Sequence, residues 1–202
     1  MFAWHGMWQA GKRSVKVRLI SGEFGGRMLE GSESDKTHPM GERIRNALFN
    51  KLSSMDDVTL DGAVVLDAFA GSGALGLEAL SRGAQSAVFI ERDRAAQNII
   101  KNNIETLKVA GNTKLVQAPV GSWVKKQIEA GVNGARFDII FADPPYDDLQ
   151  LSTTMQLIAL LQPKGLMVLS YPGKHEVPTE LGIVVVDNRS YGTAALAFYR
   201  KK

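Results

Sequence analysis

A glycine-rich turn that follows a short apolar run is the feature that most constrains the fold of this chain. Residues 63–66 are apolar, as expected of a buried parallel strand, and Gly71-Ser-Gly-Ala-Leu-Gly76 comes shortly after them. A second apolar run ends at Glu91, about twenty residues beyond the first glycine. This order of strand, glycine turn, helix and acid-terminated strand is typical of a site for an adenosine-containing ligand at the edge of a parallel sheet.

Strands and helices are predicted to alternate along the chain, which implies a parallel sheet with helices on both faces. We expect strands at residues 63–67, 86–91, 113–117, 137–142 and 165–170, and helices at residues 74–82, 94–108, 121–130 and 149–161. Residues 182–187 and 193–199 are also strand-like but have no helix between them. An antiparallel hairpin is therefore expected at the end of the sheet.

The first part of the chain is predicted to add a hairpin and a helix to this sheet. Residues 15–21 and 26–30 are separated by glycine-rich sequence, which predicts a β-hairpin. Residues 42–54 carry Ile44, Leu48 and Leu52 at four-residue spacing, which predicts a helix with one buried face.

The length and composition favour one compact domain. The chain has 202 residues, of which 45% are hydrophobic, and this suffices for one substantial core. We expect a single domain at residues 15–202, with an N-terminal part at 15–60 and a cofactor-binding and catalytic core at 61–202. Residues 1–14 are predicted to be a flexible extension, unless Trp4 and Trp8 dock on the core.

Several classes of protein are not expected from the composition. No apolar run reaches the length of about eighteen residues that a membrane span requires. The chain has no cysteine and only three scattered histidines, so neither a disulfide nor a metal site is predicted. The N-terminus lacks the long apolar core of a signal peptide, and a cytoplasmic protein is expected.

Asp67 distinguishes between the ligands that the glycine turn could hold. It ends the first apolar run, four residues before Gly71. A dinucleotide such as NAD would place a pyrophosphate close by, and a carboxylate would repel it. S-adenosylmethionine has no phosphate, but it carries an ammonium and a sulfonium group that a carboxylate attracts. We therefore expect S-adenosylmethionine; the alternatives are a nicotinamide cofactor and a glycine turn with no ligand.

The tetrapeptide Asp143-Pro-Pro-Tyr146 follows another buried-strand pattern, residues 137–142. Because the carboxyl ends of parallel strands share one edge, Asp143 is expected close to Asp67. The prolines stiffen the segment and leave its carbonyls free to accept hydrogen bonds. The Asp143 side chain and the Pro144 carbonyl could accept both N–H bonds of an amine on a purine ring, while Tyr146 stacks on that ring. The alternative is a simple turn after a strand.

Basic residues gather in the N-terminal part of the chain. The net charge is only +3, which does not identify a nucleic-acid partner. Basic side chains beside a crevice could hold RNA phosphates, although an ordinary solvated face has the same composition. The residues concerned are Lys12, Arg13, Lys16, Arg18, Arg27, Arg43 and Arg45.

Over roughly residues 15–200 the chain resembles the RsmD-type family of bacterial methyltransferases. The strings that carry the resemblance are Leu19-Ile-Ser-Gly22, Gly25-Gly-Arg27, His38-Pro39, Glu42-Arg-Ile-Arg45, Ala47-Leu-Phe-Asn50, the segment from Leu66 to Ala84, the segment from Phe137 to Tyr146, and Tyr191-Gly192. The segment from Leu66 to Ala84 is highly specific for the family. The tetrapeptide is shared more widely, including with adenine-N6 DNA methyltransferases.

The resemblance implies an α/β, Rossmann-like class I methyltransferase with a seven-stranded, mostly parallel sheet and an antiparallel C-terminal hairpin. It implies methyl transfer from S-adenosylmethionine to the N2 amine of a guanine in 16S ribosomal RNA, as free RNA or within an assembling small subunit. The alternatives are an adenine-N6 DNA methyltransferase and a non-catalytic RNA-binding protein. The expected cofactor-binding residues are Asp67, Phe69, Ala70, Gly71, Ser72, Gly73, Glu91 and Arg92, and the expected catalytic residues are Asp143, Pro144, Pro145 and Tyr146.

Three positions depart from the pattern of the family. The family usually has Arg-Pro-Thr where this chain has His38-Pro39-Met40, and an acid or amide where it has Ala118-Pro119. It often has an acidic residue where this chain has Ser170. Because the core motifs are intact, these departures favour a divergent lineage over a loss of activity.

Overall fold

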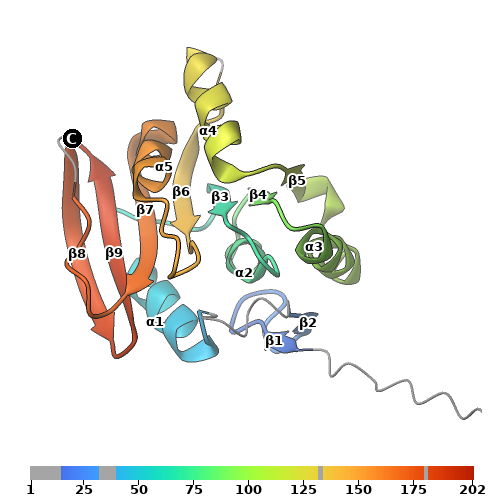
Figure 1. The fold of residues 1–202 in the computed structure, drawn as a ribbon. Coiled ribbons are helices and arrows are strands. Elements are labelled where there is room, and N and C mark those ends of the chain that lie inside the picture. Colours follow the sequence, from blue (N-terminus) through green and yellow to red (C-terminus); the bar gives the residue numbers. More distant parts are fainter. Residues whose placement is uncertain (1–14, 32–39, 132–133, 180–181) are drawn as a thin grey trace, which may run out of the picture.

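The computed structural model describes residues 15–31, 40–131, 134–179 and 182–202. A seven-stranded sheet crosses the molecule in the order β5-β4-β3-β6-β7-β9-β8 (Figure 1). Its strands are β3 (Val64–Ala68), β4 (Ser86–Glu91), β5 (Thr113–Gln117), β6 (Phe137–Ala142), β7 (Leu161–Pro172), β8 (Ile183–Tyr191) and β9 (Ala194–Lys201).

The first five strands of this sheet are parallel, and the last two are antiparallel to their neighbours. This arrangement confirms the predicted fold. The chain moves outward from β3 to β4 and β5, and then returns to the other side of β3 with β6. A crevice opens at such a reversal, beyond the carboxyl ends of the strands.

Helices cover both faces of the sheet. The helices are α1 (Glu42–Ser53), α2 (Ala74–Ser81), α3 (Arg94–Leu107), α4 (Val120–Glu129) and α5 (Leu151–Gln156), with short 3-10 helices at Ala110–Asn112 and Leu157–Leu160. Figure 1 shows α4 and α5 on one face and the other three on the opposite face. Alternate residues of β3 serve the two layers, since Val65 packs with the α1–α3 side and Leu66 with the α4–α5 side.

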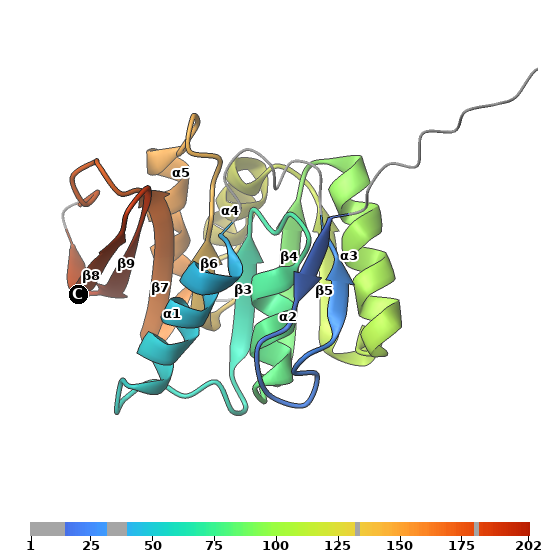
Figure 2. The ribbon, with the colours of Figure 1, turned by 90° about the horizontal axis from the view of Figure 1, so that it is seen from below.

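A small antiparallel hairpin, β1 (Lys16–Arg18) with β2 (Met28–Glu30), lies on the same face as α1 and α2 (Figure 2). The loop between its strands is held by Glu78 of α2, whose buried carboxylate accepts from the N–H groups of Ile20 (2.7 Å) and Ser21 (3.1 Å). Gly22 has φ +82° and faces the Ser81 carbonyl, where a Cβ would lie 1.7 Å from the oxygen. Only glycine fits this approach.

Four elements differ from the sequence-based expectation. The strand expected at 15–21 is the shorter β1, and the strand expected at 182–187 is β8, which continues to Tyr191. The strand predicted at 165–170 begins already at Leu161, because Lys164 (φ +67°) and Gly165 form an irregularity that lets the strand continue past Pro163. The helix predicted at 149–161 is divided into the short α5 and the 3-10 helix Leu157–Leu160. The expected extension at residues 1–14 lies outside the described residues, and the domain division stays a prediction.

Candidate cofactor and acceptor site

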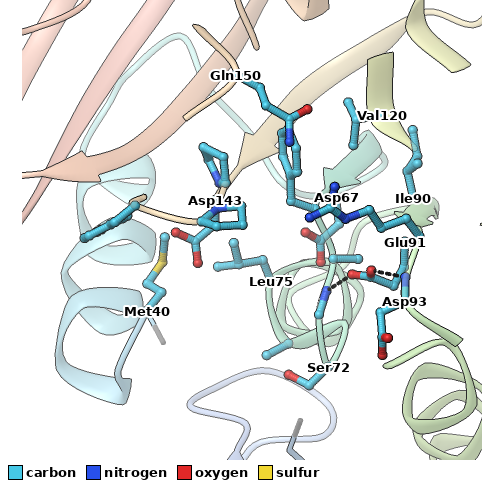
Figure 3. A pocket seen from close by; sticks show the side chains of 18 of the residues that line it. Met40, Asp67, Ser72, Leu75, Ile90, Glu91, Asp93, Val120, Asp143 and Gln150 are labelled. Atoms are coloured by element: carbon cyan, nitrogen blue, oxygen red, sulfur yellow. Dashed lines mark hydrogen bonds between the residues drawn. The ribbon is translucent and has the colours of Figure 1, made fainter. Parts of the chain in front are cut away.

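A cavity of about 390 Å³ opens at the carboxyl ends of β3, β4 and β6 (Figure 3). This size lies within the usual range for small-molecule sites. Most of the predicted site residues line it, namely Asp67, Phe69, Ala70, Gly71, Ser72, Glu91, Arg92, Asp143, Pro144, Pro145 and Tyr146. Gly73 does not line the cavity; it lies under the turn, where a Cβ would approach the Phe89 ring to 3.3 Å.

The glycine turn adopts a backbone that few residues can follow. Gly71 has φ +53° and Gly73 has φ +78°. Phe69 also has a positive φ, +64°, which costs a non-glycine residue about 1–3 kcal/mol. Strain of this kind persists where the surrounding structure fixes the backbone, and it is common in ligand-binding turns.

Glu91 fixes the turn from the end of β4. One of its carboxylate oxygens accepts from the Gly71 N–H at 2.8 Å, and the other accepts from the Asp93 N–H at 2.7 Å. Each oxygen retains a second lone pair for a donor from outside the protein. Asp93 in turn caps α3 by accepting from the Ala96 N–H at 2.8 Å. The acid is thus rigidly held at one end of the cavity.

Asp67 lies at the centre of the cavity and is 1% exposed. Its Oδ2 accepts from the Gly76 N–H at 2.9 Å, and Gly76 has no room for a side chain, since a Cβ would lie 2.4 Å from the Phe89 ring. Burial raises the pKa of the Asp67 carboxyl well above its usual range, and the nearby charges of Asp143 and Glu91 raise it further. A cationic ligand would offset the unfavourable free energy of ionising Asp67 in this buried position.

The acceptor end of the cavity is formed by the tetrapeptide and by Met40. In Figure 3, Met40 lies beside Asp143, with Asp67 in the middle and Glu91 and Asp93 at the far side. The Tyr146 hydroxyl forms a hydrogen bond of 2.8 Å with Ser170 Oγ. Burial raises the pKa of Tyr146 to about 12, so its phenol is neutral at physiological pH.

The predicted basic residues do not all share one surface. Lys16, Arg18, Arg27 and Arg43 are exposed; Arg18 pairs with Glu42 at 2.5 Å, and the Arg27 guanidinium lies 5.4 Å from the centre of the Phe24 ring. Arg45 differs from these four residues in being buried beside the crevice. It is 3% exposed, lines the cavity, and donates to the Arg18 carbonyl at 2.6 Å. Lys12 and Arg13 lie outside the described residues.

Sequence reasoning missed part of the lining. Pro119 and Val120 follow β5, so the rule that ligands bind beyond the carboxyl ends of strands could have identified them. Met40 and Gln150 come from segments outside the sheet; Met40 departs from the family pattern but was not predicted to be a site residue, and no pattern marked Gln150. The missed residues are Val17, Met40, Ala74, Leu75, Ile90, Asp93, Pro119, Val120, Asp147 and Gln150.

Within the described ranges, no helix is both long and apolar enough to cross a membrane. Also within them, no three histidine or acidic side chains come together in a way that could hold a metal ion.

Solved structures with this architecture include methyltransferases. The Escherichia coli protein yhhF is 33% identical and superposes with a TM-score of 0.75, covering 93% of this chain and 99% of that one. The protein SMU.776, solved in complex with SAH, shares the fold at 16% identity and a TM-score of 0.61, covering 78% of this chain and 48% of that one. The fold is therefore that of the S-adenosylmethionine-dependent methyltransferases.

A family model described as "conserved hypothetical protein 95" matches residues 17–200. Ribosomal RNA small subunit methyltransferase D of Escherichia coli is 41% identical over 145 residues, which cover 72% of this chain and 68% of that protein. The protein of the same name from Haemophilus influenzae is 36% identical, with coverages of 72% and 70%. The chain belongs to this RsmD-type family and is a methyltransferase.

Proposed function

We propose that this chain transfers a methyl group from S-adenosylmethionine to the N2 amine of a guanine in 16S ribosomal RNA. The single observation that carries the proposal is the meeting of Asp143-Pro-Pro-Tyr146 with the glycine turn in one cavity. The names of the relatives support ribosomal RNA as the substrate class. The choice of guanine N2 rests on the resemblance in sequence.

The cofactor is proposed to lie across the cavity. Asp67 supplies negative charge where a dinucleotide would need to place phosphates, and the described cavity residues include only two cations, Arg45 and Arg92. Glu91 is suited to accept from ribose hydroxyls, and the turn around Gly71 is suited to the methionine end. Pro119 and Val120 would line the adenine with apolar surface. When bound, S-adenosylmethionine supplies a methyl group on a sulfonium, which is a good leaving group.

Asp143 is proposed to act on the amine of the target base. The lone pair of an exocyclic amine is delocalised into the purine ring, so the amine is a poor nucleophile until its N–H bonds are oriented. The Asp143 carboxylate and the Pro144 carbonyl would accept these two N–H bonds and stabilise the positive charge that develops on nitrogen. Tyr146 would stack on the base, a contact worth about 1–3 kcal/mol.

The exposed basic residues are proposed to hold RNA phosphates. Arg18 and Arg27 belong to the N-terminal hairpin, whose second strand is tied to the cofactor turn through Asn103. The Asn103 side chain accepts from the Glu30 N–H (2.8 Å) and donates to the carbonyls of Glu30 (2.9 Å) and Ser72 (3.0 Å). An RNA held by the hairpin would therefore have a fixed position relative to the cofactor. We propose cytoplasmic ribosomal RNA, free or in an assembling small subunit, as the partner.

Two other functions remain as alternatives. An adenine-N6 DNA methyltransferase would use the same tetrapeptide, and a non-catalytic RNA-binding protein would use the same basic surface. The test is methyl transfer from labelled S-adenosylmethionine to total RNA, to small ribosomal subunits and to DNA, followed by nucleoside analysis. N2-methylguanosine in RNA supports the proposal, whereas N6-methyladenine in DNA, or cofactor binding without any transfer, contradicts it.

A further inference from the structure

Ser170 is a polar residue in an otherwise apolar part of the sheet. It lies on β7, is 1% exposed, and pairs in register with Leu196 of β9. The residues that share its face of the sheet, Val168 two positions earlier and the paired Leu196, belong to the hydrophobic core on the α1–α3 side. A buried hydroxyl in such surroundings requires a hydrogen-bond partner.

The partner of Ser170 is the hydroxyl of Tyr146, at 2.8 Å. Tyr146 lines the acceptor end of the cavity, whereas Ser170 does not reach the cavity. Among the described residues, Ser170 is linked to the cavity lining by this hydrogen bond to the phenol. Burial raises the pKa of Tyr146 to about 12. The phenol is therefore protonated at physiological pH and can form this hydrogen bond.

Tyr146 is consequently held at both ends. Pro144 and Pro145 fix the backbone that leads into it, and Ser170 fixes the far end of its side chain. A tyrosine that is anchored only by its backbone could rotate about two side-chain torsions. Anchoring the hydroxyl removes this freedom before any substrate arrives, which lowers the entropic cost of forming a productive complex.

We propose that Ser170 is a positioning residue of the acceptor site, which holds the Tyr146 ring at the angle at which a target base stacks with its amine toward Asp143. This inference rests on the proposed function. It assigns a role to a buried serine whose hydroxyl is hydrogen-bonded to the neutral Tyr146 phenol.

The test is a double-mutant cycle in single-turnover methylation of RNA. Ser170→Ala and Tyr146→Phe each remove one side of the hydrogen bond, and each should slow transfer about tenfold, as expected for a loss of about 1.4 kcal/mol in the transition state. The double variant should be no slower than the single variants, because both changes break the same bond. Cofactor affinity should stay at the wild-type value. Wild-type rates in Ser170→Ala, or fully multiplicative effects, would overturn the proposal.

Tyr171→Phe is the matched control. The neighbouring Tyr171 also donates a partly buried hydrogen bond from its hydroxyl, to Asn188 Oδ1 at 2.9 Å, but it does not line the cavity. Loss of this hydrogen bond should lower the melting temperature of the protein without slowing methyl transfer. Equal slowing in Tyr171→Phe and Ser170→Ala would show a general effect of instability and contradict a positioning role.

A second readout does not depend on methyl transfer. In protein labelled with fluorotyrosine, the ¹⁹F resonance of Tyr146 is identified by its absence from Tyr146→Phe. The Ser170→Ala change should shift or broaden this resonance and leave that of Tyr191 in place. An unchanged Tyr146 resonance would overturn the positioning role even if the chain methylates RNA. If the wild type transfers no methyl group to any RNA while the resonance responds, it is the proposed function that fails.

Discussion

At the scale of single residues, the site is a cavity in which three carboxyl groups lie close together, so that keeping all of them ionised is energetically unfavourable. Asp67 is buried between Glu91 and Asp143, and the pKa of its carboxyl is raised by burial and by these two neighbours. When no ligand is bound, ionisation of Asp67 therefore lowers the free energy of unfolding. A ligand with cationic groups offsets this loss of stability, which links the charge of the cavity to the kind of cofactor that it selects.

Replacing Asp67 by asparagine should separate stability from binding. The amide oxygen can still accept from the Gly76 N–H, but the buried charge is gone. A folded pKa above the unfolded value of about 3.9 means that the wild type loses stability as pH rises from there through the folded pKa. Asp67→Asn should remove this loss and have an equal or higher free energy of unfolding at neutral pH.

The same variant should bind S-adenosylmethionine more weakly, by about 1.5–3 kcal/mol if one charged hydrogen bond is lost. Denaturant unfolding across pH, with and without the cofactor, measures both effects. A variant that is less stable than the wild type at neutral pH, and that binds the cofactor equally well, would contradict this role of Asp67.

Glu91 is expected to have a double role, as a ligand-binding acid and as a support of the turn. Glu91→Ala removes the acceptor for the Gly71 and Asp93 N–H groups, and should weaken S-adenosylmethionine binding by about 1–3 kcal/mol. Glu105→Ala, an exposed change on α3, should leave it unaltered. Calorimetry with S-adenosylmethionine and with NAD measures the difference. Tighter binding of NAD to the wild type would refute the cofactor assignment.

The sequence predicted those site residues that immediately follow strands. Asp67, Glu91 and Asp143 each end or follow an apolar run, so their meeting at one edge follows from the parallel sheet. The sequence could not predict that the Arg45 side chain turns toward the cavity. An amphipathic pattern does not fix the direction of a long polar side chain at the boundary between the apolar and polar faces of a helix. Nor could the sequence predict the bond between Tyr146 and Ser170, which depends on the spacing of β6 and β7.

At the scale of elements, the N-terminal hairpin is joined to the core by apolar side chains and also by polar contacts. Glu78 of α2 accepts from two N–H groups of the hairpin loop and from Arg82 Nε at 2.7 Å, and it is 0% exposed. Ser81 Oγ accepts from the Phe24 N–H at 2.9 Å. Such bonds have directions, so they fix the hairpin in one orientation over α2.

Removing the Glu78 side chain should be strongly destabilising. Glu78→Ala leaves the Arg82 guanidinium and two backbone N–H groups without their buried acceptor, and a loss of about 3–5 kcal/mol is expected. The control is Glu129→Ala, which breaks an exposed 4.0 Å pair with Lys125 and should cost no more than about 1 kcal/mol. Urea unfolding measures both; similar values for the two variants would contradict the anchoring role of Glu78.

The order and type of the elements were predicted from the sequence, but the residues at which some of them begin or end were predicted less accurately. Periodicity identified α1 to α4 and the strands β3 to β6 within one residue of their bounds. The strand was predicted to begin at residue 165, yet β7 already pairs with β6 at Leu161, and this pairing resumes after the irregularity. The register in which two strands pair depends on the sequences of both strands. A local pattern of hydrophobic residues describes only one strand and therefore cannot predict that pairing.

At the scale of the whole molecule, the distribution of charge matters more than its small total. The net charge is +3, but exposed arginines lie on the hairpin whose position is fixed relative to the cavity. Polyanions bind by displacing counterions, so each phosphate contact adds to the salt dependence of affinity. A surface that holds RNA should therefore be detectable by its salt response.

Arg18→Ala and Arg27→Ala should each weaken RNA binding at low salt and reduce the salt slope by about one unit. Arg189→Ala is the control, because Arg189 has the same side-chain exposure as Arg18, 55%, and also pairs with an acid, but it lies on β8 at the far edge of the sheet. Titration of RNA at several salt concentrations gives the slopes. Equal slopes in all three variants and the wild type would make the basic residues an ordinary solvated face.

The central claim is that Asp143 orients a guanine amine for methyl transfer, and single-turnover methylation of 16S RNA and small subunits by Asp143 variants tests it most directly. Asp143→Asn keeps one acceptor and should retain part of the rate. Asp143→Ala should be slower than the wild type by about a hundredfold or more, as a loss of about 3 kcal/mol requires, while cofactor binding is kept. Equal rates of N2-methylguanosine formation in all three proteins would contradict the account.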